Sequence, residues 1–226
     1  MEKGSNLVWY VSYGSNLLES RFLCYIQGGT PKGAKTSYTG CTNKSSPQAS
    51  EKCLIRHQVY FAKHSETWCG GVAFIKSNPL PAYEKKTLGR KYLITKDQFI
   101  QVIRQENAKD ADDPSINIDF DVAEKKCQYL IGQGNQCQWY GRMINLGVSK
   151  GTYMFTFTAK WDDNFAQYTL PSDNYLKTMM KGLKETYRIA DSKIVDYLSS
   201  IPGVHCKKTR KDLETLIKEV QDARAL

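Results

Sequence analysis

The stretch Leu7–Arg21, LVWYVSYGSNLLESR, decides how the rest of the chain can be organised. Its first five residues are apolar, β-branched or aromatic, which is typical of a strand. After Tyr13–Asn16 the apolar residues change to helical spacing, until Gly28 and Gly29 end the run. These helically spaced residues are Leu17, Leu18, Phe22, Tyr25 and Ile26. The pattern therefore predicts a strand that turns through a short polar loop into a helix.

The predicted loop Tyr13-Gly14-Ser15-Asn16 has the properties of an anion site. A turn at the start of a helix leaves backbone N–H groups unpaired, next to the positive end of the helix dipole. Such a loop can hold a carboxylate or the oxyanion that develops during acyl transfer. The alternative is an ordinary strand–turn–helix in which Ser15 or Asn16 only caps the helix.

A second helix is predicted from Thr95 onward, and its apolar face carries an unexpected carboxylate. Thr95 and Gln98 match a capping box, and Phe99, Val102 and Ile103 form the apolar face. Glu106 lies seven residues after Phe99 and four after Val102, so it falls on the same face. We expect a buried, proton-carrying carboxyl group, unless the last turn frays and turns Glu106 to water.

Composition restricts the classes of protein to consider. The 226 residues suffice for a substantial core, and no run approaches the roughly 18 apolar residues of a membrane span. With a polar N-terminus and no leader pattern, we expect a cytoplasmic protein without a membrane partner. Seven cysteines and three histidines lack metal-ligand spacing, which indicates reduced thiols and no metal site.

The remaining pattern indicates an α+β fold around one mixed sheet. Residues 30–56 are polar and are expected to form a long irregular connection, whereas 107–138 resemble an inserted segment. The part from 172 to 226 is expected to be helical. Strands are expected around the two ranges 57–63 and 71–75, at 91–94, and at 138–146 and 152–158.

Four motifs, in order, resemble those of the γ-glutamylcyclotransferase family. SYGSNLLESR (12–21) resembles its opening motif, including Arg21, and TWCGGVAFI (67–75) its second strand motif. YLITKDQFIQVIRQEN (92–107) is similar to the strand and helix that carry the family's catalytic glutamate, which falls on Glu106. LPSDNYLKTMMKGLKE (170–185) is similar to its C-terminal Pro-Ser-x-x-Tyr helix. The ranges 30–56 and 107–138 depart from the family pattern.

The resemblance implies a single domain, 1–226, built as a small closed mixed β-barrel flanked by helices. It also implies conversion of a γ-glutamyl amine or peptide to 5-oxoproline and a free amine, without a cofactor. On this reading Glu106 is catalytic, and the substrate-binding residues are Tyr13, Gly14, Ser15, Asn16, Tyr140 and Tyr175. Tyr140 is assigned because it opens the strand after the insertion, and Tyr175 because it is the tyrosine of the Pro-Ser-x-x-Tyr motif.

This chemistry agrees with the residues themselves. The substrate's α-amine attacks its own γ-carbonyl, and the amide nitrogen is protonated as it leaves. One carboxyl group whose pKa is raised by burial can act first as base and then as acid. Glu84 is the rival, but Lys85, Lys86 and Arg90 surround it in sequence and would keep its pKa low.

Other readings remain open. A non-catalytic barrel could use the same pocket for a small acidic ligand, and residues 107–138 could form a lid, block the site or pack on the outer surface. The net charge, 32 − 23 = +9, raises the question of nucleic acid, but the basic residues are scattered, and we expect no nucleic-acid partner. A hydrolase built on Cys69 with His57 or His64 has no support from spacing. The sequence leaves open which γ-glutamyl compound is used and whether the protein is a monomer or a homodimer.

Overall fold

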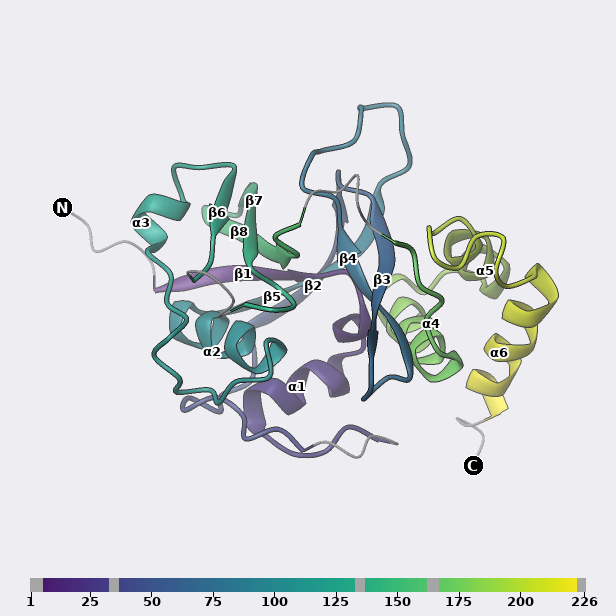
Figure 1. Ribbon diagram of the computed structural model, residues 1–226, viewed down its shortest axis with the longest axis horizontal. Helices are drawn as coiled ribbons and strands as arrows, with labels where there is room; N and C mark the ends of the chain where they lie inside the picture. The colour runs from purple at the N-terminus through teal and green to yellow at the C-terminus, as the bar shows by residue number, and fades with distance from the viewer. Residues whose placement is uncertain (1–5, 33–36, 133–136, 162–166, 223–226) are drawn as a thin grey trace.

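A six-stranded mixed sheet forms the centre of the computed structural model, which describes residues 6–32, 37–132, 137–161 and 167–222. The strands lie in the order β2-β5-β1-β8-β7-β6. Strand β1 runs parallel to β8 and antiparallel to β5 (Figure 1), so the expected mixed sheet is confirmed. The strands are β1 Leu7–Ser12, β2 Ala49–Ile55, β5 Thr87–Thr95, β6 Gln128–Leu130, β7 Arg142–Ser149 and β8 Thr152–Thr158.

All the longer helices gather in two groups around this sheet (Figure 1). A 3₁₀ turn, Ser15–Leu17, leads into α1 Glu19–Gln27, which lies near α2 Lys96–Glu106 along one side of the sheet. Helices α4 Asp173–Tyr187, α5 Asp191–Ser199 and α6 Arg210–Asp222 form the second group, at the right of the figure. The expected helical C-terminal part is therefore confirmed for the described residues.

The hairpin of β3 Val59–Ser65 and β4 Gly70–Ile75 lies between the sheet and the second helix group (Figure 1). One apolar core joins this hairpin to α4, α5 and α6, and includes Phe61, Phe74 and Leu176. A second core packs α1 and α2 on the sheet, and includes Phe22 and Phe99. These two cores therefore fix the positions of the two helix groups on either side of the space between them.

The expected closed barrel is wrong, because the hairpin has its own two-stranded ladder within the described residues. Threonine side chains connect it to the sheet instead. Thr87 Oγ1 accepts from the N–H of Val59 (3.1 Å) and donates to the carbonyl of His57 (2.7 Å). Thr158 Oγ1 bonds the N–H and carbonyl of Ile75 in the same way. A side chain placed between two backbones holds them farther apart than a ladder hydrogen bond does, so the sheet stays open.

Two local predictions have different outcomes. The capping box of α2 is confirmed, since Thr95 Oγ1 accepts from the N–H of Gln98 and the Gln98 side chain accepts from the N–H of Thr95. The irregular connection over 30–56 is wrong at its end, where β2 pairs with β5. Strand β2 lies at the edge of the sheet and most of its side chains are partly exposed, so it carries no apolar alternation to reveal it.

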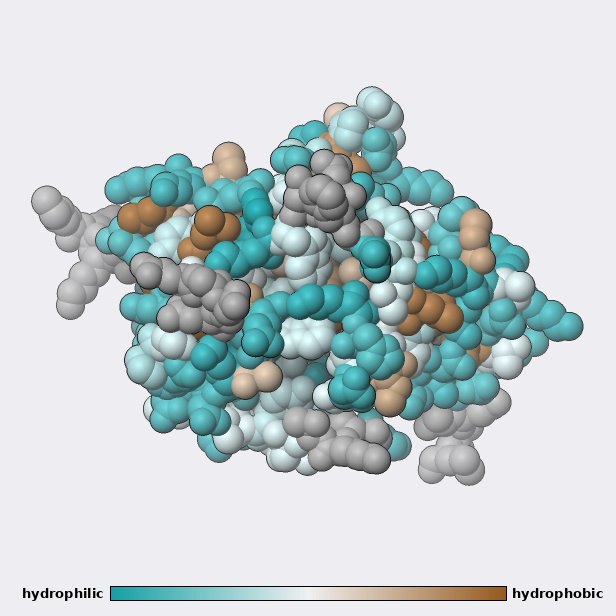
Figure 2. Space-filling model, in the orientation of Figure 1, coloured by the Kyte–Doolittle hydropathy of each residue, from teal (hydrophilic) through white to brown (hydrophobic). Residues whose placement is uncertain are grey.

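The surface in Figure 2 is mostly hydrophilic, with separated apolar spots and no continuous apolar face. The large apolar side chains that are exposed come from distant parts of the chain: Leu54, Tyr83, Leu130, Val148 and Tyr168. Across the described ranges, no helix is both long enough and apolar enough to cross a membrane. The single-domain assignment of 1–226 stays a prediction.

Candidate functional site

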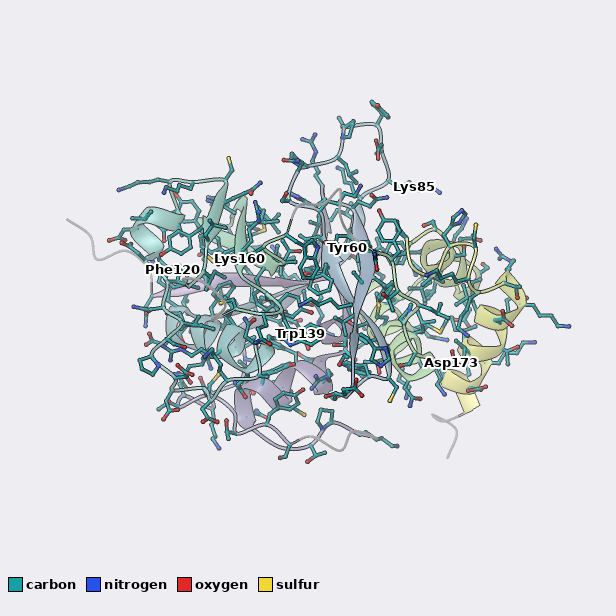
Figure 3. The ribbon with its side chains drawn as sticks, in the orientation of Figure 1. Tyr60, Lys85, Phe120, Trp139, Lys160 and Asp173 are labelled. Atoms are coloured by element: carbon teal, nitrogen blue, oxygen red, sulfur yellow. The ribbon has the colours of Figure 1, made fainter. Side chains whose placement is uncertain are left out.

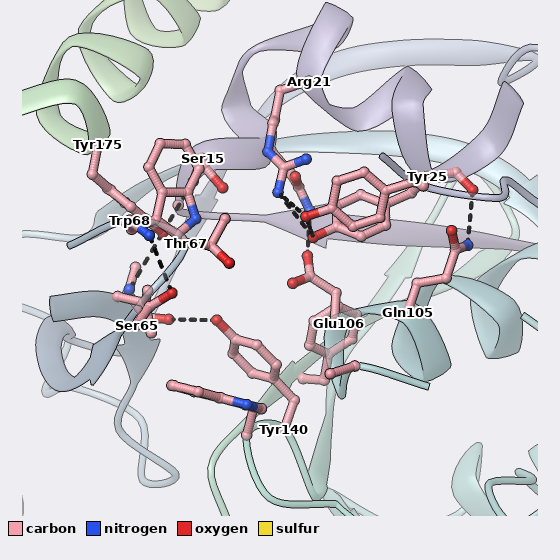
Figure 4. A pocket seen from close by; sticks show the side chains of 18 of the residues that line it. Ser15, Arg21, Tyr25, Ser65, Thr67, Trp68, Gln105, Glu106, Tyr140 and Tyr175 are labelled. Carbon is pink, nitrogen blue, oxygen red and sulfur yellow. Dashed lines mark hydrogen bonds between the residues drawn. The ribbon is translucent and has the colours of Figure 1, made fainter. Parts of the chain in front are cut away.

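A cavity of about 330 Å³ opens between the two helix groups (Figure 4). Its walls come from the end of β1, the 3₁₀ turn, α1, the β3–β4 turn, the end of α2, the segment before β7 and the start of α4. All seven residues assigned to the site from the sequence line it: Tyr13, Gly14, Ser15, Asn16, Glu106, Tyr140 and Tyr175. Tertiary packing thus brings together residues up to 162 positions apart, the difference between 175 and 13.

The loop after β1 is held against α4 through Tyr175. The Tyr175 hydroxyl oxygen accepts from the backbone N–H groups of Ser15 and Ala73, each at 3.3 Å. Burial raises the pKa of Tyr175, so the phenol keeps its proton at neutral pH. Because two donors already point at its oxygen, this proton is available to a ligand in the cavity.

Gly14 makes this close approach possible. A Cβ at this position would lie 2.7 Å from the Tyr175 hydroxyl and 3.0 Å from the Cβ of Ala73. Tyr13 fixes the loop from the other side, since its hydroxyl donates to the carbonyl of Phe157 at 2.7 Å. Packing around the loop therefore restricts which residues can occupy it, in addition to the requirement for its backbone N–H donors.

Glu106 is the last residue of α2 and faces the cavity. It does not fray: α2 continues to Glu106, and Asn16 Nδ2 donates to its Oε1 at 2.7 Å. Burial raises the pKa of Glu106, while the charge of Arg21 and hydrogen bonds from Asn16 and Tyr25 partly offset that rise. A carboxyl group with a raised pKa that faces a cavity is suited to accept a proton and return it.

Asn16 links the loop to Glu106. Its Nδ2 also lies 3.1 Å from the Tyr10 hydroxyl, and its backbone carbonyl accepts from the Tyr92 hydroxyl at 2.8 Å. Its side-chain oxygen is buried and has no partner in the described part of the chain. Asn16 is therefore fixed in place, and its side-chain oxygen is an available hydrogen-bond acceptor beside the Glu106 carboxyl group.

Tyr140 reaches the cavity because Asn107 anchors the chain on both sides of the insertion. The Asn107 side chain accepts from the N–H groups of Trp139 and Tyr140 and donates to the Tyr140 carbonyl, all at 3.0 Å. The Tyr140 hydroxyl in turn donates to the carbonyl of Ala73 at 3.3 Å. Tyr140 thus joins the end of α2 to the hairpin across the cavity.

Most of the inserted segment lies away from the cavity. Helix α3 Phe120–Ala123 packs on the second core, and β6 extends the sheet beside β7. In Figure 3, Phe120 lies at the far left of the molecule, whereas Trp139 lies near its centre. Of the described residues in the segment, only Ala108, near its start, lines the cavity, together with residues 139–140 directly after the segment. Residues 133–136 lie outside the described residues, so a lid role stays a prediction.

Glu84, Cys69 and His57, which the sequence offers as alternatives, make other contacts. Glu84 is exposed and lines a different cavity, beside α5. The Cys69 thiol contacts the carbonyl of Glu66, and His57 Nδ1 lies 2.8 Å from the carbonyl of Lys76. All seven cysteines are free. A search of the described ranges finds no group of three His, Cys, Asp or Glu side chains that could hold a metal ion.

Among the cavity-lining side chains that the sequence analysis did not assign to the site are Arg21, Tyr25, Tyr38 and Trp68. Arg21 and Tyr25 are four residues apart on α1, a spacing that places them on one helix face, and this could have revealed the pair. Tyr38 carries no such signal, because it lies in the connection after α1.

Comparisons with known proteins find similar solved structures and a similar sequence. No family model matches the chain. A solved γ-glutamyl cyclotransferase structure superposes over 94% of this chain and 99% of its own, with a TM-score of 0.50 and 16% identity. An uncharacterised protein from Homo sapiens superposes over 95% and 99%, with a TM-score of 0.50 and 17% identity.

One curated protein is similar in sequence. Histone deacetylase 5 of Arabidopsis thaliana is 33% identical in an alignment of 202 residues that covers 84% of this chain. The chain spans 30% of the length of that relative.

Proposed function

Because the chain has the fold of γ-glutamyl cyclotransferases, we propose that it is a cyclotransferase that converts a γ-glutamyl amine or peptide to 5-oxoproline and a free amine. The observation that carries the proposal is the position of Glu106: a carboxyl group with a raised pKa, facing a cavity beside a loop of backbone donors. An intramolecular reaction needs an acid/base and an oxyanion site but no enzyme nucleophile.

In the proposed reaction Glu106 moves one proton. Its carboxylate removes a proton from the substrate's α-amine as the nitrogen attacks the γ-carbonyl and closes the five-membered ring. The carboxylic acid then protonates the amide nitrogen, the C–N bond breaks, and the amine leaves. Because burial raises the pKa of Glu106, its carboxyl group holds the proton more tightly than an exposed glutamate does, which favours a carrier that takes up a proton and then returns it.

The loop and two tyrosines bind the substrate in this proposal. Tyr175 offers its phenol proton, and the Ser15 N–H beside it adds a backbone donor. Together with Tyr13, Gly14 and Asn16, they form the subsite for the glutamyl carboxylate or the developing oxyanion. The Tyr140 ring forms the opposite wall.

The chain matches less than a third of histone deacetylase 5, so the name of that protein assigns no activity to this chain. The runner-up function is a non-catalytic protein that binds a small acidic ligand in the same cavity.

The test is release of 5-oxoproline from a panel of γ-glutamyl dipeptides and γ-glutamyl amines, with Glu106→Gln as the variant. Gln keeps the shape but cannot transfer the proton, so turnover should fall by about 10²–10⁴ while calorimetry still detects ligand binding. Glu84→Gln is the matched control and should remain active. Binding without turnover by the unmodified protein would favour the runner-up. An active Glu106→Gln beside an inactive Glu84→Gln would overturn the assignment.

A further inference from the structure

Arg21 is a buried cation in the wall of the cavity. Only 5% of its surface is exposed, and its Nη2 donates to the hydroxyls of Tyr25 (3.1 Å) and Tyr38 (2.8 Å). Its Nε and Nη1 are buried and have no partner in the described ranges. The guanidinium also lies over the rings of Tyr25, Tyr38 and Trp68, at 4.7–5.5 Å from their centroids. Burying a charge with so few hydrogen bonds is costly, so its presence here requires a reason.

Tyr25 connects this cation to the carboxyl group. Its oxygen accepts from Arg21, which leaves its proton free to hydrogen-bond to Glu106. The Tyr38 hydroxyl, at 3.4 Å, is a poorer acceptor for that proton. In Figure 4 the Arg21 side chain points toward the Tyr25 hydroxyl, and Glu106 lies directly beyond it.

The two helices that carry these groups are joined at the same place. The side chain of Gln105, next to Glu106, donates to the backbone carbonyl of Tyr25 at 2.9 Å. Its side-chain oxygen accepts from the N–H of Gly40 at 3.3 Å. The separation of α1 and α2 is therefore fixed where Tyr25 meets Glu106.

We propose that Arg21 and Tyr25 are positioning residues for Glu106: Arg21 orients the Tyr25 hydroxyl, and together they hold the Glu106 carboxylate toward the cavity and stabilise its ionised form. The effect of Arg21 and Tyr25 on catalysis rests on the proposed cyclotransferase function, whereas their effect on the ionisation of Glu106 does not.

The other titratable groups around Glu106 do not supply this charge. Those facing it from β1, the segment before β7 and α4 are Tyr10, Tyr140 and Tyr175, and burial raises the pKa of each, so they remain neutral. From the hairpin turn, His64 and Glu66 line the cavity with side chains 56% and 97% exposed, where water screens them. Among the described residues that line the cavity, Arg21 is the only arginine or lysine.

The experiment is a pH titration of Glu106 by ¹³C NMR on protein labelled at the glutamate carboxyl carbon. The resonance is assigned by its loss in Glu106→Gln. Tyr25→Phe removes the hydroxyl that bonds Glu106. In this variant the titration midpoint of Glu106 should rise by about one pH unit, as expected for the loss of one hydrogen bond to a charged group. Tyr38→Phe is the matched control, because the Tyr38 hydroxyl bonds Arg21 rather than Glu106, and the titration midpoint of Glu106 should move far less in this variant.

Arg21→Gln should raise the midpoint as well, and Arg21→Lys should restore part of the change because it keeps the charge. Tyr25→Phe carries the test if Arg21→Gln does not fold. The acidic limb of the kcat/KM profile should move with the NMR midpoint. A midpoint in Tyr25→Phe equal to that of the unmodified protein would overturn the proposal. Coupled midpoints in a protein that releases no 5-oxoproline would instead refute the proposed function alone.

Discussion

Asn107 should be one of the most sensitive positions in the molecule. It caps the C-terminal end of α2, is 6% exposed, and makes four side-chain hydrogen bonds of 3.0 Å. Two of them are accepted from the N–H groups of Trp139 and Tyr140, and two are donated to the carbonyls of Ile103 and Tyr140. Asn107→Ala removes all four and leaves backbone groups beside the cavity without partners.

The size of the effect follows from these bonds. Each contributes about 0.5–1.5 kcal/mol, and Trp139 and Tyr140 are only partly buried, so water replaces some of the loss. We expect Asn107→Ala to lower the free energy of unfolding by about 3 kcal/mol. For a chain of this length that corresponds to a fall in Tm of about 6–12 °C.

Thermal and urea unfolding followed by circular dichroism measure this change. Asn145→Ala is the control, because Asn145 also makes side-chain bonds, to the Glu124 carbonyl and the Gly147 N–H, but at a more exposed position. It should cost about 1 kcal/mol or less. If Asn107→Ala melts within about 2 °C of the unmodified protein, or no lower than Asn145→Ala, the reasoning from buried bonds is refuted.

Three further outcomes are expected. The folded-state pKa of Glu106 lies above its ordinary value of 4.5, so the folded state holds the proton more tightly. The stability of the unmodified protein relative to Glu106→Gln should therefore fall as pH rises above 4.5 in urea titrations, and the opposite slope would contradict the sign. Gly14→Ala would place a Cβ 2.7 Å from the Tyr175 hydroxyl, so KM for a γ-glutamyl substrate should rise, and an unchanged KM would count against the loop's role. Gly182→Ala would place a Cβ 2.5 Å from the backbone of Leu17, so it should cost about 1–3 kcal/mol in chemical unfolding despite the better helix propensity of Ala; a gain in stability would show that the two segments separate freely.

Local patterns in the sequence determined the elements and the chemical groups. The strand–loop–helix at Tyr13–Asn16 depends on neighbouring residues, and the capping box of α2 lies within four residues, so both could be predicted. The register of α2 also predicted that Glu106 falls on the face of Phe99 and Val102, because helical periodicity is a property of the sequence alone. The α+β class followed from the order of these elements.

Only the tertiary structure decided how those groups meet. The pairing of β2 with β5 and the open sheet depend on contacts between distant segments, for which a single sequence carries no periodic signal. The same holds for Arg21: its spacing to Tyr25 is visible in the sequence, but its position beside Glu106 arises only when α1 packs on α2. Burial raises the pKa of a carboxyl group only where other segments exclude water from it. The sequence alone therefore identified the carboxylate, and the packing of α1, α2, α4 and the hairpin around one cavity set its environment.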